Sequence, residues 1–403
     1  MEFDMVDNAA VGTVIKVVGV GGAGGNAVQH MINKGMSGVE FIAANTDAQA
    51  LATSSAHNII QIGESGLGAG MKPEIGRQLA EESRSRIEDS LRGAHLVFIA
   101  AGMGGGTGTG AAPIVAEIAK SLGALTVAVV SKPFSYEGQK CMDIAEDGLD
   151  ELSKHVDSLI IILNEKLEEI YEDETMIEWM QHADDVLNNA VAGIAEIINV
   201  PGHINVDFND VKTIMGEQGK AMMGTATASG VDRARVAAEQ AGASPLLDGI
   251  DLSGARGVLV NVTASRGLKG KEIKEVMAPV RAFAAPDASI AQGIAYDDSM
   301  GDNIRVTVVA TGLGKAKKAM QLVQQPMLRT GTHNTPMMAS GSALHASSGV
   351  AMGSTSVAGH GAMDALKQPA VWRREQASEQ VQAMQRNGVD TYDIPAFLRK
   401  QAD

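Results

Sequence analysis

Residues 102–110 read GMGGGTGTG, which places six glycines in nine positions. The loop follows an apolar run of strand length at 95–101 and leads into a helical stretch at 111–121. Because glycine has no Cβ, the backbone N–H groups of such a loop can crowd around an anion at a helix N-terminus, where the helix dipole adds to the attraction. The stretch therefore predicts a phosphate-binding turn between a strand and a helix.

A second glycine loop, GVGGAGGN at 19–26, also follows a strand and opens a helix. Taken alone it satisfies the G-x-G-x-x-G pattern of dinucleotide-binding proteins, and Asp47 lies after the next strand, where such proteins carry a ribose-binding acid. An NAD-dependent oxidoreductase is therefore an alternative interpretation. It leaves the 102–110 loop unexplained, and the sequence shows no clear His or Lys constellation for hydride transfer. Two glycine loops at neighbouring strand ends favour a ligand with several phosphates.

The apolar pattern predicts an α/β fold. Continuous apolar runs separated by helical segments are typical of a parallel sheet that is covered on both faces, and they occur at 13–20, 39–44, 95–101, 125–130 and 158–163. Apolar residues then recur with a 3.6-residue period over 183–198, which predicts a long central helix. Three β runs follow at 258–264, 290–296 and 304–311 without regular helices between them, which favours a smaller C-terminal α+β domain.

The apolar patterns typical of helices and strands weaken after residue 316, and 330–363 contains no Asp, Glu, Lys or Arg and no aromatic residue. Such a stretch cannot bury enough surface to offset its chain entropy. The last segment, DTYDIPAFLRK at 390–400, is typical of a peptide that becomes structured on binding. We therefore expect a flexible N-terminal tail at 1–12, a nucleotide-binding domain at 13–180, the central helix at 181–203, a C-terminal domain at 204–316, a disordered linker at 317–388 and a partner-binding peptide at 389–403.

Charge and cysteine content exclude several classes of protein. The chain has 33 basic and 48 acidic residues, a net charge of −15, which argues against general affinity for nucleic acid or anionic lipid. One cysteine excludes a disulfide framework. The acidic start and the lack of a long apolar run predict a cytoplasmic chain without direct membrane insertion. Since neither glycine loop contains Lys or Arg, we expect backbone dipoles, Mg²⁺ and the hydroxyls of Thr107 and Thr109 to offset the phosphate charge.

The GGGTGTG run at 104–110 is similar to the signature of the tubulin and FtsZ superfamily, and the chain resembles the FtsZ family of bacterial division GTPases over its whole length. Further family motifs stand in family order: GVGGAGGN at 19–26, AANTDAQAL at 43–51, GLGAG at 66–70, PFSYEG at 133–138, NVDFNDV at 205–211 and IDLSGARGVLVN at 250–261. The resemblance implies a GTP-dependent filament protein of the cytokinetic ring at midcell. It also implies that 204–316 acts in GTPase activation and polymerisation.

The resemblance also implies a set of nucleotide-binding residues. Glu137 matches an acid that contacts the ribose, and Asp184 matches the residue that reads guanine, where a carboxylate can accept from N1–H and the exocyclic amine. Two departures stand out: Cys141, preceded by Lys140, takes the place of a phosphate-contacting Arg, and Met180 takes the place of a Phe that stacks on the base. Cys141 is nevertheless included among the expected nucleotide-binding residues. The matching phosphate-loop residues are Gly22, Ala23, Gly24, Gly25, Asn26, Gly106, Thr107 and Gly108.

The turn at 205–210 has two interpretations. On the residues alone, its Asp and Asn side chains cap the helix that follows. The resemblance implies instead that Asp207 and Asp210, together with Asn205, complete the active site of the neighbouring subunit and orient the water that attacks the γ-phosphate. A contact of that kind is heterologous and does not close, so it generates a head-to-tail filament. A nucleotide-binding structural protein without hydrolysis is a further alternative.

The C-terminal peptide resembles the segment by which family members dock on membrane tethers such as FtsA and ZipA. The alternative for this segment is a frayed terminus. Membrane contact is then expected to be indirect, through a docked partner. The residues expected to bind such partners are Asp393, Ile394, Pro395, Phe397, Leu398, Arg399 and Lys400.

Overall fold

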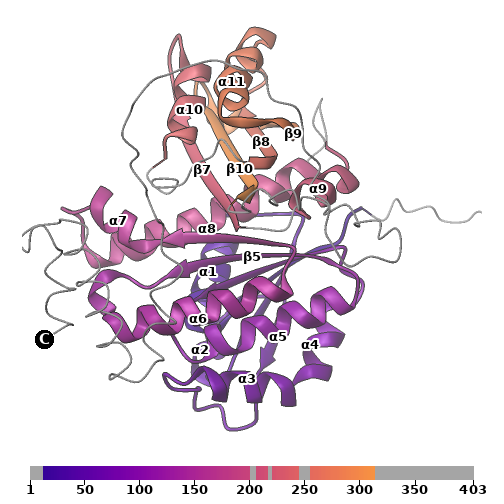
Figure 1. Ribbon diagram of the computed structural model, residues 1–403, viewed down its shortest axis with the longest axis vertical. Coiled ribbons are helices and arrows are strands. Elements are labelled where there is room, and N and C mark those ends of the chain that lie inside the picture. The colour runs from indigo at the N-terminus through magenta and orange to yellow at the C-terminus, as the bar shows by residue number, and fades with distance from the viewer. Residues whose placement is uncertain (1–11, 200–205, 217–219, 245–254, 314–403) are drawn as a thin grey trace, which may run out of the picture. The chain divides into compact units, whose positions relative to one another are not determined.

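A computed structural model describes residues 12–199, 206–216, 220–244 and 255–313 (Figure 1). The predictions for the N-terminal tail, for Asn205, for the linker and for the C-terminal peptide therefore lie outside the described residues, apart from Gly12 at the tail's last position. Among the described helices, none combines the length and the apolar character needed to cross a lipid bilayer.

The N-terminal part contains six parallel strands in the order β3-β2-β1-β4-β5-β6. β1 lies between β2 and β4, so the direction in which strands are added reverses there. In sheets of this type the crevice at the reversal, outside the carboxyl ends of the strands, is where ligands bind. The strands are β1 (Ile15–Val20), β2 (Glu40–Asn45), β3 (Asn58–Gln61), β4 (Leu96–Gly102), β5 (Leu125–Lys132) and β6 (Ser158–Leu163).

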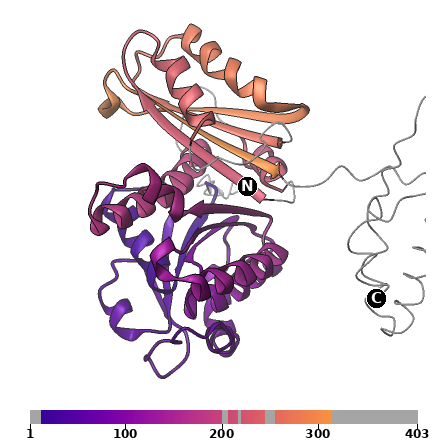
Figure 2. The same cartoon turned by 60° about the vertical axis from the view of Figure 1, so that its left-hand side comes forward.

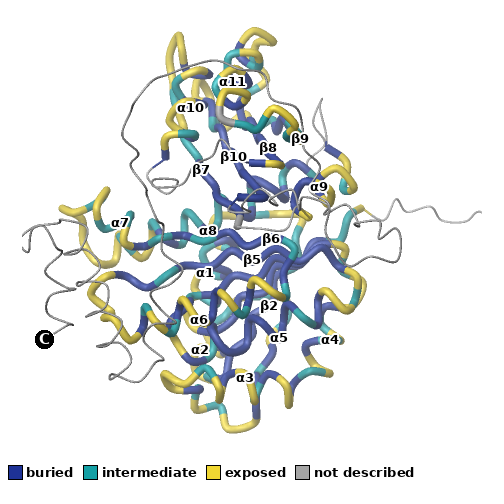
Figure 3. Tube along the Cα trace, viewed as in Figure 1, coloured by how far each residue is buried: buried dark blue, intermediate teal, exposed yellow. Residues whose placement is uncertain are grey.

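Helices cover both faces of these strands, whose residues are buried almost throughout except in the edge strand β3 (Figure 3). One buried cluster joins Val17 and Phe98 to the long helix α8 (Met176–Asn199) and to α1 (Gly21–Asn33). A second cluster joins Val18 and Ile99 to the opposite helices. These are α3 (Pro73–Glu82), α4 (Arg84–Leu91), α5 (Thr107–Ser121) and α6 (Gln139–His155), and two short helices, α2 (Ala48–Ala52) and α7 (Asn164–Ile170), lie in the connections. The predicted doubly wound domain and its long central helix are confirmed.

The C-terminal part is a mixed four-stranded region in the order β7-β10-β8-β9, in which only β8 and β9 pair in parallel. It continues the same sheet through a short β6–β7 pairing. α8 packs on one face and α10 and α11 on the other (Figure 2). The elements are α9 (Phe208–Met215), β7 (Lys220–Ala228), α10 (Arg233–Gly242), β8 (Ala255–Ala264), α11 (Gly270–Phe283), β9 (Ala284–Tyr296) and β10 (Ile304–Leu313).

One sequence expectation for this region is wrong, because α11 separates the run at 258–264 from the run at 290–296. The other helix, α10, precedes all three runs and lies between β7 and β8. The buried side of α10 is built from alanines, among them Ala234, Ala237 and Ala241, so its apolar periodicity is weak. β7 escaped prediction for a related reason, since KAMMGTATA contains no Val, Ile or aromatic residue. The α+β class of the domain is nevertheless confirmed.

Candidate functional site

The two glycine loops meet at one cavity of about 620 Å³, outside the carboxyl ends of β1, β4 and β5. The starts of α1 and α5, the loop after β2 and the first half of α8 complete its walls. Eight of the eleven nucleotide-binding residues expected from the sequence line it: Gly22, Ala23, Asn26, Gly106, Thr107, Gly108, Glu137 and Asp184. Gly24, Gly25 and Cys141 do not.

The first loop turns β1 directly into α1. Gly21 has a φ of +75°, and Gly24 is buried where a Cβ would collide with the carbonyl oxygen of Ala100. Gly24 therefore brings α1 close to β4 and does not itself face the cavity. The N-terminus of α1 has no side-chain cap and no acidic residue in its first turn. Its first N–H groups are thus suited to an anionic ligand.

The second loop is held by its own backbone and by Thr109. The Thr109 hydroxyl accepts from the Gly104 N–H at 2.9 Å and is buried, so it braces the loop and does not line the cavity. A Cβ on Gly106 would collide with the carbonyl oxygen of Gly70. Thr107 Oγ1 faces the cavity and lies 2.6 Å from Thr46 Oγ1, a residue that the sequence reasoning missed.

Acidic side chains stand on two other walls. Glu137 is exposed at the cavity rim and its Oε1 accepts from the Phe134 N–H at 3.0 Å. Asp47 also lines the cavity, but its carboxylate caps α2 by accepting from the Gln49 N–H at 2.8 Å. The capping bond gives Asp47 a structural use that the dinucleotide interpretation did not foresee.

An aromatic stack borders the same cavity beside Met180. The Phe134 ring lies 5.5 Å from Tyr136 and 6.2 Å from Trp179, both nearly parallel to it. Phe134 and Tyr136 line the cavity together with Met180. The position of the expected stacking Phe is thus occupied by a thioether, and two aromatic rings line the same cavity.

Two further polar side chains, Asp184 and Asn164, line the cavity. Burial raises the pKa of Asp184 on α8 to about 6, and the charge of Asp185 adds to this while that of His30 opposes it. Asn164 at the end of β6 is buried, and its Oδ1 has no hydrogen-bond partner among the described residues. A buried acceptor without a donor is costly unless a ligand supplies one. The sequence signal for Asn164 was a polar residue that ends an apolar strand.

Asp184→Asn is expected to raise the melting temperature of the nucleotide-free protein at neutral pH. The carboxyl binds a proton more tightly in the folded protein, where its pKa is about 6, than at its ordinary value of 3.8. It therefore costs stability as the pH rises through this interval, and asparagine does not. The difference in melting temperature should grow between these two pH values and stay constant above them. A variant that melts with the wild type at neutral pH would contradict the assigned shift.

Cys141, which takes the place of a phosphate-contacting Arg in the sequence, does not line the cavity. Cys141 is buried in the first turn of α6, and a Cβ on Gly104 would approach its carbonyl oxygen to 2.9 Å. Lys140 lines a separate groove with Arg77 and Glu151. Of the described residues that line the nucleotide-sized cavity, Lys132 is the only lysine or arginine, and its Nζ donates to Glu146 at 3.0 Å.

The acidic turn lies away from this cavity. Asp207 caps α9 by accepting from the Asp210 N–H at 2.8 Å, as the capping interpretation predicted, and both acids are exposed. Neither lines the cavity. They follow the C-terminal end of α8, and Asn199 at that end lies roughly 22 Å along the helix from Asp184, at 1.5 Å per residue.

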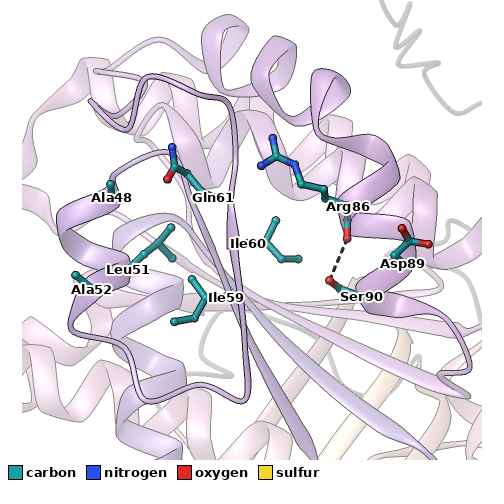
Figure 4. Close-up of a pocket in the computed structure, with 9 residues that line it drawn as sticks. All are labelled: Ala48, Leu51, Ala52, Ile59, Ile60, Gln61, Arg86, Asp89 and Ser90. Carbon is teal, nitrogen blue, oxygen red and sulfur yellow. Dashed lines mark hydrogen bonds between the residues drawn. The ribbon is translucent and has the colours of Figure 1, made fainter.

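A second groove, of about 530 Å³, lies at the edge strand β3 (Figure 4). Its floor contains Leu51 and Ile60, and Ser90 on its rim donates to the carbonyl oxygen of Arg86 at 3.0 Å. It contains no residue expected from the sequence and no helix N-terminus with free N–H groups. The cavity at the two glycine loops is therefore the candidate functional site.

Comparisons with known proteins agree with this geometry. A family model described as the Tubulin/FtsZ family GTPase domain matches residues 14–172, and one described as the FtsZ family C-terminal domain matches 219–314. The cell division protein FtsZ of Azotobacter vinelandii is 48% identical over all of both chains, and that of Pseudomonas putida is 49% identical over the same extent.

Solved structures give the same result. An FtsZ dimer from M. jannaschii superposes with a TM-score of 0.73 at 44% identity, covering 75% of this chain and 89% of that one. CetZ2 from Haloferax volcanii, at 20% identity and a TM-score of 0.63 over 76% of this chain and 95% of that one, shares the fold. The resemblance drawn from the sequence motifs is confirmed: the chain belongs to the Tubulin/FtsZ family and is a cell-division GTPase of that family.

Proposed function

We propose that this chain forms head-to-tail filaments in which GTP is hydrolysed at each contact between subunits, and that these filaments build the division ring at midcell. One observation carries the proposal: the nucleotide-sized cavity and the acids Asp207 and Asp210 stand at opposite ends of α8. No side chain is long enough to reach from one end of α8 to the other. A second copy of the chain must bring the acids to the cavity.

The phosphates bind at the two glycine loops in this proposal. The N–H groups at the starts of α1 and α5 face them, and Thr107 adds its hydroxyl. The exposed Glu137 accepts from the ribose hydroxyls. Cys141 makes no phosphate contact, because it is buried outside the cavity.

Mg²⁺ fits this site as an ion held mainly by the phosphates. No cluster of three acidic, His or Cys side chains suited to a metal occurs among the described residues. Mg²⁺ usually needs few protein ligands when phosphates and water supply the rest. The Thr46 and Thr107 hydroxyls, 2.6 Å apart, are the side-chain oxygens that would hold it. When bound, the ion neutralises charge on the phosphate oxygens.

The base is read at the other end of the cavity. Ionised Asp184 accepts from the N1–H and the exocyclic amine of guanine, a pair of donors that adenine lacks. The unpartnered Oδ1 of Asn164 also requires a donor, which a bound base can supply. Base binding thereby offsets the cost of holding one buried and one half-buried acceptor.

Catalysis in this proposal consists of positioning. Asp207 and Asp210 sit at the start of α9, where the capping hydrogen bond fixes one relative to the other. In the filament they orient a water toward the γ-phosphate of the adjoining subunit, and Asn205 contributes from the same turn. The loops supply charge stabilisation and the acids aim the nucleophile.

Light scattering combined with phosphate release, on adding GTP and Mg²⁺, tests the function. Both signals are expected, and both should appear only above a threshold protein concentration. An oxidoreductase would give neither signal. A nucleotide-binding structural protein would give scattering alone, and that outcome would refute hydrolysis.

Partner binding through residues 389–403 is a separate part of the proposal and rests on the sequence alone. The peptide docks FtsA- and ZipA-like tethers and holds the filament under the membrane. A chain truncated after residue 388 should assemble and hydrolyse GTP normally while losing binding to both tethers in pull-downs. Retained binding would show that the partner site lies elsewhere.

A further inference from the structure

An ion-pair clamp joins α1 to α8 beside the cavity. Asp185 Oδ1 lies 2.7 Å from His30 Nε2 and 3.1 Å from Lys34 Nζ. His30 belongs to α1 and Lys34 is its C-cap, whereas Asp185 belongs to α8. The clamp is half-buried, with 20% of the His30 and 37% of the Asp185 side chain exposed.

His30 and Asp185 each lie close along their helix to a residue that lines the cavity. Asn26 lines it and precedes His30 by four residues, so both lie on one face of α1. Asp184 lines it and immediately precedes Asp185. Neighbouring residues on a helix point about 100° apart. α8 can therefore present Asp184 to the cavity and Asp185 to α1 at the same time.

The apolar contact under the clamp does not fix the register of the two helices by itself. The buried apolar cluster that the two helices share includes Ala27 and Met31 of α1 and Ala183 and Leu187 of α8. Hydrophobic burial is not directional, whereas two charge-assisted hydrogen bonds to one carboxylate oxygen are. Burial raises the pKa of Asp185, but the hydrogen bonds from His30 and Lys34 outweigh this and leave it below its ordinary value.

We propose that Asp185 is a positioning residue for base recognition: it fixes α8 against α1 so that Asp184 meets the guanine edge while the start of α1 meets the phosphates. This inference rests on the proposed function of the cavity. Asp185 itself does not line the cavity, so it acts through Asp184. A half-exposed ion pair adds little to stability, which leaves geometry as its main effect.

Binding of GDP and of IDP to the full-length chain, by calorimetry without Mg²⁺, tests the proposal. IDP lacks the exocyclic amine that Asp184 would accept from. Asp185→Ala is expected to weaken GDP binding about fivefold or more, since small misplacements are costly, and to weaken IDP binding less, because IDP offers Asp184 only its N1–H. Glu117→Ala is the matched control, because Glu117 makes an interhelical pair with Arg84 at 2.7 Å and is 42% exposed, outside the cavity. It should leave both affinities unchanged.

The outcomes distinguish a failure of the role proposed for Asp185 from a failure of base reading by Asp184. Equal weakening of GDP and IDP by Asp185→Ala, or no weakening, would overturn the positioning role. Asp184→Asn that keeps the full preference for GDP would instead refute base reading by Asp184, which belongs to the proposed function. Thermal melts of all variants, together with the milder Asp185→Asn, exclude loss of folding as the cause.

A double-mutant cycle with His30→Ala tests whether the effect passes through the clamp. If Asp185 acts by holding α1, the two substitutions should weaken GDP binding by less together than the sum of their separate effects. Full additivity in GDP binding would show that His30 takes no part in positioning.

Discussion

Asp210→Ala is expected to lower steady-state GTP turnover by about a hundredfold or more, because positioned groups in catalysis contribute that much. Nucleotide affinity and filament formation should persist. Asp210 is exposed at the start of α9 and does not line the cavity of its own chain, so its removal disturbs neither the loops nor the packed core. Phosphate release and light scattering on the same sample measure both properties.

The matched control is Thr213→Ala, since Thr213 is an exposed residue on the same short helix and its hydroxyl donates to the Asn209 carbonyl oxygen. It should leave turnover close to wild type. Normal phosphate release by Asp210→Ala would refute the catalytic assignment. Loss of turnover in both variants would point to a general effect on α9.

Gly106→Ala is expected to weaken GDP binding by about a hundredfold or more, an effect typical of a displaced binding loop. The φ of Gly106 is −80°, which alanine adopts freely, so backbone strain plays no part. The added Cβ would collide with the carbonyl oxygen of Gly70, and Gly70 itself lines the cavity. Calorimetry measures the loss, and an affinity close to wild type would contradict the role of this loop.

Gly270→Ala supplies the control for this substitution. Gly270 opens α11 in the C-terminal domain, and a Cβ there would meet nothing within 4 Å. Its nucleotide affinity should equal that of the wild type. A fall in both variants would indicate that alanine at helix starts destabilises the chain in general.

Mixing the two defective proteins tests hydrolysis between subunits. Asp210→Ala retains an intact cavity and Gly106→Ala retains intact acids. In the proposed filament, a Gly106→Ala subunit can dock its acids on the cavity of an Asp210→Ala subunit, so the mixture should release phosphate although neither protein does alone. An inactive mixture would contradict catalysis in trans.

The N-terminal domain was predicted well from the sequence, because its strands and glycine loops are marked by residues that are neighbours along the chain. Strand β6 was predicted with the bounds that the structure has, and the loops before α1 and α5 were located from glycine spacing alone. Thr46 and Asn164 were missed, because their contribution depends on which strand ends the sheet brings together. Thr109 was given a ligand role, whereas the fold turns its hydroxyl to the Gly104 N–H. Residue spacing along the chain cannot show whether the Thr109 hydroxyl points to a ligand or to the backbone of its own loop.

The length of α8 also has a consequence for GTP hydrolysis along a filament. In the proposed filament a chain does not bring its own acids to its own cavity, so the subunit whose cavity faces solvent at one tip has no catalytic neighbour. Every filament, whatever its length, therefore keeps one idle site. The rate of GTP hydrolysis per chain should rise with filament length and then level off. The site at the tip keeps its GTP, while the interior sites hydrolyse theirs.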